Sequence, residues 1–432
     1  MDTFAQRHAR TGPNAQEASP AGAAAEANDY SFECEDGPNV TWQVLQMELV
    51  EALFEPYALT VELTTDDVDA ELDDMLGASC RLWIERGEQQ RCVPGIVHRL
   101  DTSETDGRLL HVRAFVRPAL WLLTQRIDSR TWQHLSAPEI LREVLTAPLA
   151  QHGREIVFDL RGTYSEREYC VQYRESDYGF ACRLMEEEGI SFYFDREDDN
   201  ERLVLTDTND LYPSVPTEPN APDFVVPWVD NPDQAAGSQA VWSLHSSQEL
   251  TSTSVVRRDF DWRTPGDRSV SESRATDHRG FDREVFDPGQ QHTSARGGEQ
   301  LVARQREALA VQRRRFRGQG NIVGFSPGHV FELPDHPHAS SDPRYLLTRV
   351  VHESGTTDAA GADRPAQPDL EYGSSFECIP LDVPFRPLPR HTRPRIHGPQ
   401  TAMVTGPEGD QIHTEEHGRI RVLMRWDRDA PA

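Results

Sequence analysis

Short stretches in which apolar and polar residues alternate recur along the chain, which is the pattern of half-buried β-strands. In the first clear case, residues 57–64, the side chains of Leu59, Val61 and Leu63 fall on one face. Glycine, aspartate and proline separate most of these stretches, as expected for turns between strands. The same pattern is found at residues 81–85, 95–100, 108–116, 190–194, 202–206, 240–244, 254–262, 330–333, 345–351 and 401–426.

Helical periodicity is confined to three segments. A capping box begins the segment 136–145, and the second segment, 176–188, stops at Gly189. The third runs from 294 to 317 and stops at Gly318. Many strands with few helices, and no internal repeat evident in the sequence, predict a β-rich α+β fold with several domains.

Proline-rich and low-periodicity segments divide the chain. Residues 1–42 are predicted to be a disordered leader, because they are rich in Ala, Pro, Glu and Asn without periodicity. The further predicted units are a first β-barrel-like domain at 43–135, a small α/β segment at 136–210, a linker or long loop at 211–238, a second β-barrel-like domain at 239–379, a proline-rich connector at 380–399 and a last β segment at 400–432.

The charge of the chain restricts the kinds of partner that it can bind. Lys+Arg number 44 against 72 Asp+Glu, which gives a formal net charge of −28 over 432 residues. Nucleic acid and anionic membranes are disfavoured as partners, since both require a surplus of basic residues. The longest apolar runs are about five residues, as at 119–123, so no membrane span is expected, and the first residues lack the apolar core of a signal peptide. The six Cys form no CxxC pair, which predicts reduced thiols and no cysteine-based metal site.

One motif resembles the nucleophile elbow of serine hydrolases. Gly324-Phe-Ser-Pro-Gly328 matches G-x-S-x-G, with Ser326 as the candidate nucleophile. The oxyanion hole of an elbow uses the backbone N–H of the residue after the serine, and Pro327 has none. A strand pattern follows where an elbow requires a helix. We therefore interpret the motif as a β-turn.

A second motif resembles a zinc peptidase. His413-Thr-Glu-Glu-His417 matches H-x-x-E-H, but the two imidazoles face one metal only when the segment is a helix. Gly409 and Gly418 flank the motif and alternation follows it, which favours a β-hairpin. Neither motif supports catalysis, and we predict no catalytic, cofactor-binding or metal-binding residue and no cofactor.

Three weaker patterns have plain structural readings. The basic run 313–317 before Gly318 and Gly320 lacks the spacing of a phosphate loop and is interpreted as a solvated helix end. Asp335-His-Pro-His338 is interpreted as a turn with surface imidazoles. The acidic run 66–74 lacks the glycine and closing glutamate of a calcium loop and is expected to be solvated.

Longer strings resemble the VgrG family, the spike-tip proteins of bacterial type VI secretion. The strongest is Cys170-Val-Gln-Tyr-Arg-Glu-Ser-Asp177, followed by Leu184-Met-Glu-Glu-Glu-Gly-Ile190. The resemblance extends in a consistent order over residues 45 to 428. The other strings are Leu53-Phe-Glu-Pro-Tyr57, Pro118-Ala-Leu-Trp-Leu-Leu123, Asp259-Phe-Asp-Trp262, Phe316-Arg-Gly-Gln-Gly-Asn321, Pro327-Gly-His-Val-Phe331, Tyr345-Leu-Leu-Thr-Arg-Val-Val-His352, Phe376-Glu-Cys-Ile-Pro380, Gly398-Pro-Gln-Thr-Ala402, Gly418-Arg-Ile-Arg-Val422 and Arg425-Trp-Asp-Arg428.

This resemblance implies a homotrimeric hub related to the baseplate hub of contractile phages, with no catalytic role. The implied partners are the hexameric tube protein (Hcp), baseplate components and effectors, with a PAAR-repeat protein at the tip of the needle. The implied location is the cytoplasm during assembly, followed by export through the type VI apparatus without a signal peptide.

The resemblance also implies a complete OB-fold and a needle after the connector, whereas residues 400–432 supply only the first OB strands. A truncated or split gene, a fragment, or a partner that completes the barrel each accounts for this. PAAR binding, which the resemblance places at the needle tip, is therefore in doubt for this chain. The alternatives left open by the sequence are a hub of a phage tail or extracellular contractile injection system, a hydrolase using Ser326 or a His413/His417 metal site, and a product that does not assemble.

Overall fold

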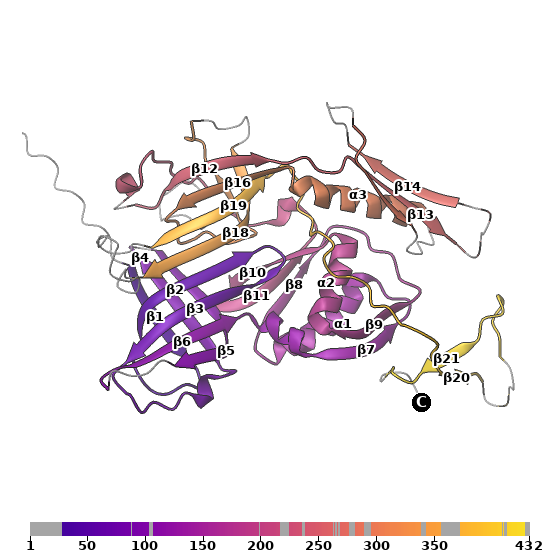
Figure 1. Ribbon diagram of the computed structural model, residues 1–432, viewed down its shortest axis with the longest axis horizontal. Coiled ribbons are helices and arrows are strands. Elements are labelled where there is room, and N and C mark those ends of the chain that lie inside the picture. The colour runs from indigo at the N-terminus through magenta and orange to yellow at the C-terminus, as the bar shows by residue number, and fades with distance from the viewer. Residues whose placement is uncertain are drawn as a thin grey trace, which may run out of the picture.

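One long antiparallel sheet dominates the molecule (Figure 1). The computed structural model describes residues 28–87, 89–102, 107–197, 199–216, 224–235, 238–261, 263, 266, 268–275, 281–288, 295–337, 343–355, 372–407, 409 and 413–427. The 11-stranded sheet has the order β1-β4-β5-β6-β3-β2-β18-β19-β16-β12, and β17 pairs with β18 beside this path. Its strands are β1 (Asn28–Cys34), β2 (Gln43–Ala52), β3 (Glu55–Thr65), β4 (Ser79–Arg86), β5 (Gln89–Thr102), β6 (Leu110–Arg117), β12 (Val241–Gln248), β16 (Arg314–Gly320), β17 (Val330–Glu332), β18 (Arg344–Gly355) and β19 (Gly373–Pro380).

The helices and most of the four small sheets lie to one side of the long sheet, on the right in Figure 1. Helices α1 (Ala137–Ala150) and α2 (Asp177–Glu188) pack on each other, and α3 (Ala295–Val311) packs on β13 and β14. The predicted capping box at Ser136 and the stop of α2 at Gly189, in the left-handed conformation, are both present. The small sheets contain β7 (Ile127–Trp132) with β9 (Cys170–Ser176); β8 (Glu155–Asp159) with β10 (Ser191–Glu197) and β11 (Asn200–Thr206); β13 (Ser254–Phe260) with β14 (Arg268–Arg274) and β15 (Glu284–Pro288); and β20 (Ala402–Thr405) with β21 (Arg421–Met424).

The long sheet is built from two copies of one topology. Across the sheet, the five strands β2 to β6 lie in the spatial order β2-β3-β6-β5-β4. The five strands β12 and β16 to β19 lie in the corresponding order β12-β16-β19-β18-β17. We call these the first repeat and the second repeat. The second repeat carries β13, β14, β15 and α3 as an insertion between its first two strands. The expectation of no internal repeat is therefore wrong at the level of structure, because backbone pairing is conserved between the two units and side-chain identity is not.

The registers of the two repeats agree in detail. A bulge in β5 between Val97 and Arg99, opposite β6, has its counterpart in β18 between Leu347 and Arg349, opposite β19. Bulges also interrupt the equivalent β2–β3 and β12–β16 ladders near their ends.

A glycine precedes β4 and β17 in the same geometry. Gly77, with φ +89°, donates its N–H to the carbonyl of Val97, and Gly328, with φ +80°, donates to Leu347. Both glycines occupy the left-handed region that favours this residue. The correspondence of bulges, hydrogen bonds and φ angles fixes which residue of one repeat matches which residue of the other.

The sheet refutes two boundaries expected from the sequence. Residues 28–34 were expected to belong to a disordered leader, but they form edge strand β1 against β4, with Phe32 in the core; residues 1–27 lie outside the described residues. The third helix was expected to reach 317, but it ends at Val311, and the basic run continues as strand β16. Alternation decides this, because Phe316 points into the core while Arg315 and Arg317 point away from it.

The segment 211–238 is not a free linker. Val215 and Val226 are buried in the core of the second repeat, and residues 214, 225 and 228 form isolated bridges to strands of the sheet. The chain is β-rich α+β as predicted. The two barrel-like units share one sheet, because β2 of the first repeat pairs with β18 of the second.

Candidate functional site

The proline-rich connector is seated against the C-terminal end of α2, where three glutamates follow one another (Figure 1). We define the connector seat as Glu186, Glu187 and Glu188 together with residues 381–394 of the connector, which contact this part of the molecule. The seat borders an open hollow of about 910 Å³ that is lined by residues of α2, α3, β13, β15 and the connector. Carboxylates in this position are disfavoured by the dipole of the helix, so their cationic partners stabilise them.

Glu186 holds the backbone of the connector. Its Oε2 accepts hydrogen bonds from the N–H groups of Arg390 at 3.0 Å and His391 at 2.9 Å. Its Oε1 lies 2.7 Å from Nδ1 of His391. Because proline-rich chain cannot form a ladder of its own, a buried carboxylate here supplies the acceptors that a neighbouring strand would otherwise supply.

Glu187 and Glu188 bind guanidinium groups from three elements. Arg167 donates to both carboxylates at 2.7 Å, and Arg393 of the connector donates to Glu187 at 2.8 Å. Arg304 of α3 donates to Glu188 at 2.6 Å. Burial alone raises the pKa of Glu187, but Arg167 and Arg393 outweigh burial and hold this pKa at about 2. Glu187 is therefore charged at every physiological pH.

The start of the connector is fixed separately. The Asn209 side chain donates to the carbonyls of Leu381 and Val383, at 2.9 and 2.7 Å, and accepts from the N–H of Phe385. Arg386 donates to the carbonyls of Gly189 and Asp207 and pairs with Glu307 of α3 at 2.9 Å. The connector is thus a bound strap over its described length.

Replacing Glu186 with alanine should release the middle of the connector. Two charge-assisted hydrogen bonds to backbone N–H groups, each of about 1.5 to 3 kcal/mol, are lost together with the contact to Nδ1 of His391. Hydrogen exchange of the Arg390 and His391 amides should accelerate by at least about tenfold, since about 1.4 kcal/mol corresponds to that factor. The matched control is Glu55→Ala, which removes only the exposed side-chain pair with Arg390 and should change exchange less than about threefold. Unchanged amide exchange in the Glu186 variant would show that the seat does not hold the strap.

A buried polar network joins the two repeats. Arg91 of β5 donates to Glu51 of β2 at 2.5 Å and to Nε2 of His352 of β18 at 2.7 Å. Nδ1 of His352 is 2.5 Å from the hydroxyl of Tyr372, which donates to the Ile322 carbonyl. Nε2 of His352 also lies 3.0 Å from the carbonyl oxygen of Phe325. No sequence pattern indicated this network, because its members are scattered over the chain.

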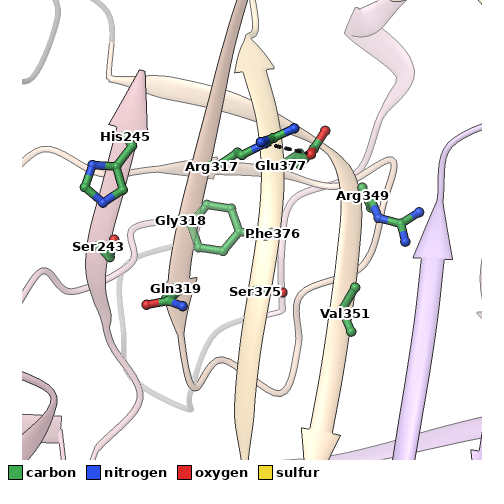
Figure 2. A pocket seen from close by; sticks show the side chains of 10 residues that line it. All are labelled: Ser243, His245, Arg317, Gly318, Gln319, Arg349, Val351, Ser375, Phe376 and Glu377. Atoms are coloured by element: carbon green, nitrogen blue, oxygen red, sulfur yellow. Dashed lines mark hydrogen bonds and ion pairs between the residues drawn. The ribbon is translucent and has the colours of Figure 1, made fainter. Parts of the chain in front are cut away.

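A shallow hollow of about 330 Å³ lies on the outer face of the second repeat (Figure 2). His245, Arg317 and Arg349 line it from three strands, and Arg317 pairs with Glu377 at 2.9 Å. Gly318 also borders the hollow, and a Cβ there would lie 2.2 Å from the ring of Phe376. The hollow is an open cationic surface, and its geometry suits contact with another macromolecule better than chemistry on a small substrate.

The serine motif occupies a turn. The N–H of His329 donates to the carbonyl of Ser326 at 3.2 Å, and the chain continues as strand β17, which confirms the β-turn. Ser326 is buried and is followed by Pro327, so the elbow geometry is not formed.

The H-x-x-E-H segment is not helical, as the sequence predicted. Thr414 bridges to Ile420 in an antiparallel hairpin, which carries His413 and His417 on extended and turn backbone. No group of three or more His, Cys, Asp or Glu side chains able to hold a metal ion is found in the described ranges.

The remaining motif residues are dispersed. The basic run lies in β16, so it is neither a helix end nor a phosphate loop; the interpretation as a helix end is wrong. His336 packs edge-on against Trp228 at 4.6 Å between ring centres, and His338 lies outside the described residues. The acidic run is mostly exposed around a 3-10 turn at Asp73–Met75. All six cysteines are free thiols.

The last strands form a hairpin that projects from the body (Figure 1). Trp426 packs edge-on against Tyr173 at 5.2 Å, and Arg419 pairs with Glu168 at 2.7 Å. Four apolar side chains of the hairpin are exposed: Met403, Val404, Ile420 and Val422. A two-stranded hairpin is marginal by itself, so this apolar surface is typical of a sheet that further strands complete.

Comparison with known proteins matches this architecture to one family. The model of the phage tail baseplate hub (GPD) family matches residues 50–357, from the end of β2 to the end of β18. The chain belongs to the phage tail baseplate hub family. The relation to a baseplate hub that the sequence implied is thereby confirmed.

Two relatives are spike proteins of the type VI secretion system. The chain is 32% identical over 397 residues to the type VI secretion system spike protein VgrG1b of Pseudomonas aeruginosa, covering 89% of this chain and 51% of that protein. It is 31% identical over 407 residues to VgrG1a of the same organism, covering 92% and 60%. The chain thus spans about half to three-fifths of the length of these curated relatives.

A solved structure shares the fold. The E. coli c3393 protein, described as a component of the type VI secretion system with structural similarity to the T4 bacteriophage tail proteins gp27 and gp5, superposes with a TM-score of 0.66 at 20% identity. The match covers 91% of this chain and 88% of that one. In the part of the chain that the structure describes, the helices are too short or too polar to span a bilayer.

Proposed function

We propose that this baseplate hub protein forms the hub of a type VI secretion spike, assembling as a homotrimer that caps the tube and carries effectors. The observation that carries the proposal is the pair of matched repeats in one continuous sheet. A trimer of such chains presents six equivalent units, which suits a hexameric tube protein (Hcp). The spike proteins that are about 31–32% identical over most of this chain support the type VI assignment.

The connector seat supplies the mechanical part of this function. The connector, which is held by buried charge-assisted hydrogen bonds, transmits force from the long sheet to the hairpin β20–β21. The hairpin β20–β21 is proposed to be the start of an OB-fold. Its exposed apolar side chains would be covered by the further strands of such a barrel. Baseplate components are proposed to surround the ring.

The proposed role is structural, without catalytic residues or a cofactor. The geometry at Ser326, His413 and His417 supports neither a hydrolase nor a metallopeptidase. Assembly in the cytoplasm followed by export through the contractile apparatus is proposed as the route. A hub of a phage tail or an extracellular injection system is the second candidate, which the match to the phage family model favours.

Two measurements test the proposal. Size-exclusion chromatography with light scattering of the purified chain should give the mass of a trimer. An epitope-tagged chain should reach the culture medium only in cells with a functional contractile sheath, and Ser326→Ala should be exported equally well. A monomer at all concentrations, or export independent of the sheath, would contradict the type VI hub.

A further inference from the structure

Edge strand β1 places two cysteines opposite each other. In the antiparallel pairing of β1 with β4, Cys34 is the register partner of Cys80. Both side chains pack on the core of the first repeat, because they follow the alternation that also points Phe32 and Leu82 inward. In the described strand registers, no other two of the six cysteines are paired in this way.

The backbone at this pair has the geometry that a disulfide requires. The N–H of Glu35 donates to the carbonyl of Ser79 at 2.9 Å, so these two neighbours form a hydrogen-bonded pair. Hydrogen-bonded and non-hydrogen-bonded pairs alternate along antiparallel strands, which makes Cys34 and Cys80 a non-hydrogen-bonded pair with Cα atoms about 4.5 Å apart. Disulfides bridge Cα separations of about 4.4 to 6.8 Å, so the two strands already meet this requirement.

We propose that Cys34 and Cys80 are an oxidation site, at which a disulfide forms and fastens edge strand β1 to β4. The loop that this bond closes contains residues 35–79, and with them β2 and β3. Such a cross-link stabilises a protein mainly by constraining its unfolded state. The timing of the oxidation rests on the proposed export, because thiols stay reduced in the cytoplasm and are oxidised outside it.

Burial determines which of the two sulfurs reacts first. All six cysteines lie in the described residues, and Cys34 is partly exposed whereas the other five are buried. Gly37, in the turn after β1, leaves room around the Cys34 sulfur, since a Cβ there would lie 3.3 Å from it. Cys80 is 1% exposed. An oxidant therefore reaches Cys34, and Cys80 completes the bond from the interior.

The oxidant is a small disulfide, for which oxidised glutathione is the probe. The Cys34 thiolate attacks one sulfur of the glutathione disulfide, forms a mixed disulfide and releases one glutathione thiolate. The Cys80 thiolate then attacks the Cys34 sulfur and releases the second one. Two protein thiols are thereby oxidised, and their two protons pass to the two glutathione thiolates that are released. Burial is the main cause that raises the pKa of both protein thiols, so the reaction accelerates as the pH rises above 7.

Oxidation of the native chain tests the site. Incubation of the purified full chain with oxidised glutathione at pH 8.5 should lower by two the number of thiols titrated after denaturation. Chymotryptic digestion should give a peptide that links Cys34 to Cys80, and hydrogen exchange of the β1 amides should slow at least about tenfold. Cys34→Ser should abolish both effects. The matched control is Cys92→Ala, which lies opposite Trp83 on the other face of the sheet from Cys80 and should leave the bond unchanged.

The outcomes separate this site from the proposed hub. A native chain that keeps all its thiols, or that stops at a glutathione adduct on Cys34 with Cys80 still free, would overturn the oxidation site. A trimer without the disulfide would do so while leaving the hub intact, and a monomer that forms the disulfide would do the reverse. An epitope-tagged chain whose free thiols are blocked with maleimide should carry the disulfide in the culture medium and lack it in the cytoplasm. An exported chain with both thiols free would overturn the timing.

Discussion

Replacing Arg91 with methionine is expected to lower the free energy of unfolding by about 3 to 5 kcal/mol, the usual cost of removing one partner of a buried ion pair. The side chains of Arg91 and Glu51 are 4% and 12% exposed. The substitution leaves the Glu51 carboxylate without its cation, and the carbonyls of Val323 and Phe325 lose a donor. Urea unfolding followed by tryptophan fluorescence measures the change.

Two controls separate the buried charge from the general loss of an arginine. Arg113→Met removes a partner of Glu62 on the exposed face of the same sheet and should cost less than about 1 kcal/mol. The double variant Glu51→Gln/Arg91→Met removes the stranded charge, so it should be more stable than the sum of the single losses predicts. Strict additivity would show that the two groups do not interact.

Acidification from pH 7 to 4.5 is expected to destabilise the protein through two buried histidines. Burial is the main cause that lowers the pKa of His329 and of His352 to about 4. The unfolded chain binds protons at these residues near pH 6.5, whereas the folded chain does not, so stability falls as the pH falls through this window. At about 1.4 kcal/mol per pH unit, the full window corresponds to about 3 kcal/mol for each imidazole.

One carboxyl acts in the opposite direction. Burial raises the pKa of Glu201 to about 7, and the hydroxyl of Tyr57 lies 2.6 Å from its Oε2 and also contacts the Pro94 carbonyl. A single hydroxyl proton serves one of these acceptors, so a protonated Glu201 satisfies both contacts by donating to Tyr57. The folded state therefore binds this proton between pH 4.5 and 7 while the unfolded state does not, and Glu201 stabilises the fold as the pH falls.

The variants His329→Gln and Glu201→Gln should shift the pH dependence of stability in opposite directions. His329→Gln should make the loss of stability on acidification smaller, and Glu201→Gln should make it larger, because glutamine keeps a donor toward Tyr57 at every pH. His417→Gln, on the exposed hairpin, is the control and should leave the profile unchanged. Urea unfolding at pH 8, 6 and 4.5 gives the profile of each variant and of the wild type. A Glu201→Gln profile parallel to that of the wild type would contradict the buried proton.

Local patterns predicted much of the fold because they depend on neighbours in sequence. The alternation at Leu59, Val61 and Leu63, the cap at Ser136 and the stop at Gly189 each report a short-range geometric requirement, and each is found in the structure. The same reasoning failed at the basic run after α3. There, helical periodicity and alternation overlap for a few residues, and only pairing with β12 and β19 selects the strand.

Sequence chemistry also excluded the serine elbow, since Pro327 lacks the N–H that an oxyanion hole needs, and it indicated the family through ordered strings of residues. What remained out of reach were the features made by distant segments: the Arg91–Glu51–His352 network, the seating of the connector on α2, and the matched repeats. Glu51 and His352 are 301 positions apart along the chain and 3.3 Å apart in space. Alternation fixes which face of a strand is buried, whereas the partner of each strand depends on long-range closure of the sheet. The sequence by itself determined the local elements and the kinship of this protein, and the tertiary structure decided how two divergent repeats share one sheet.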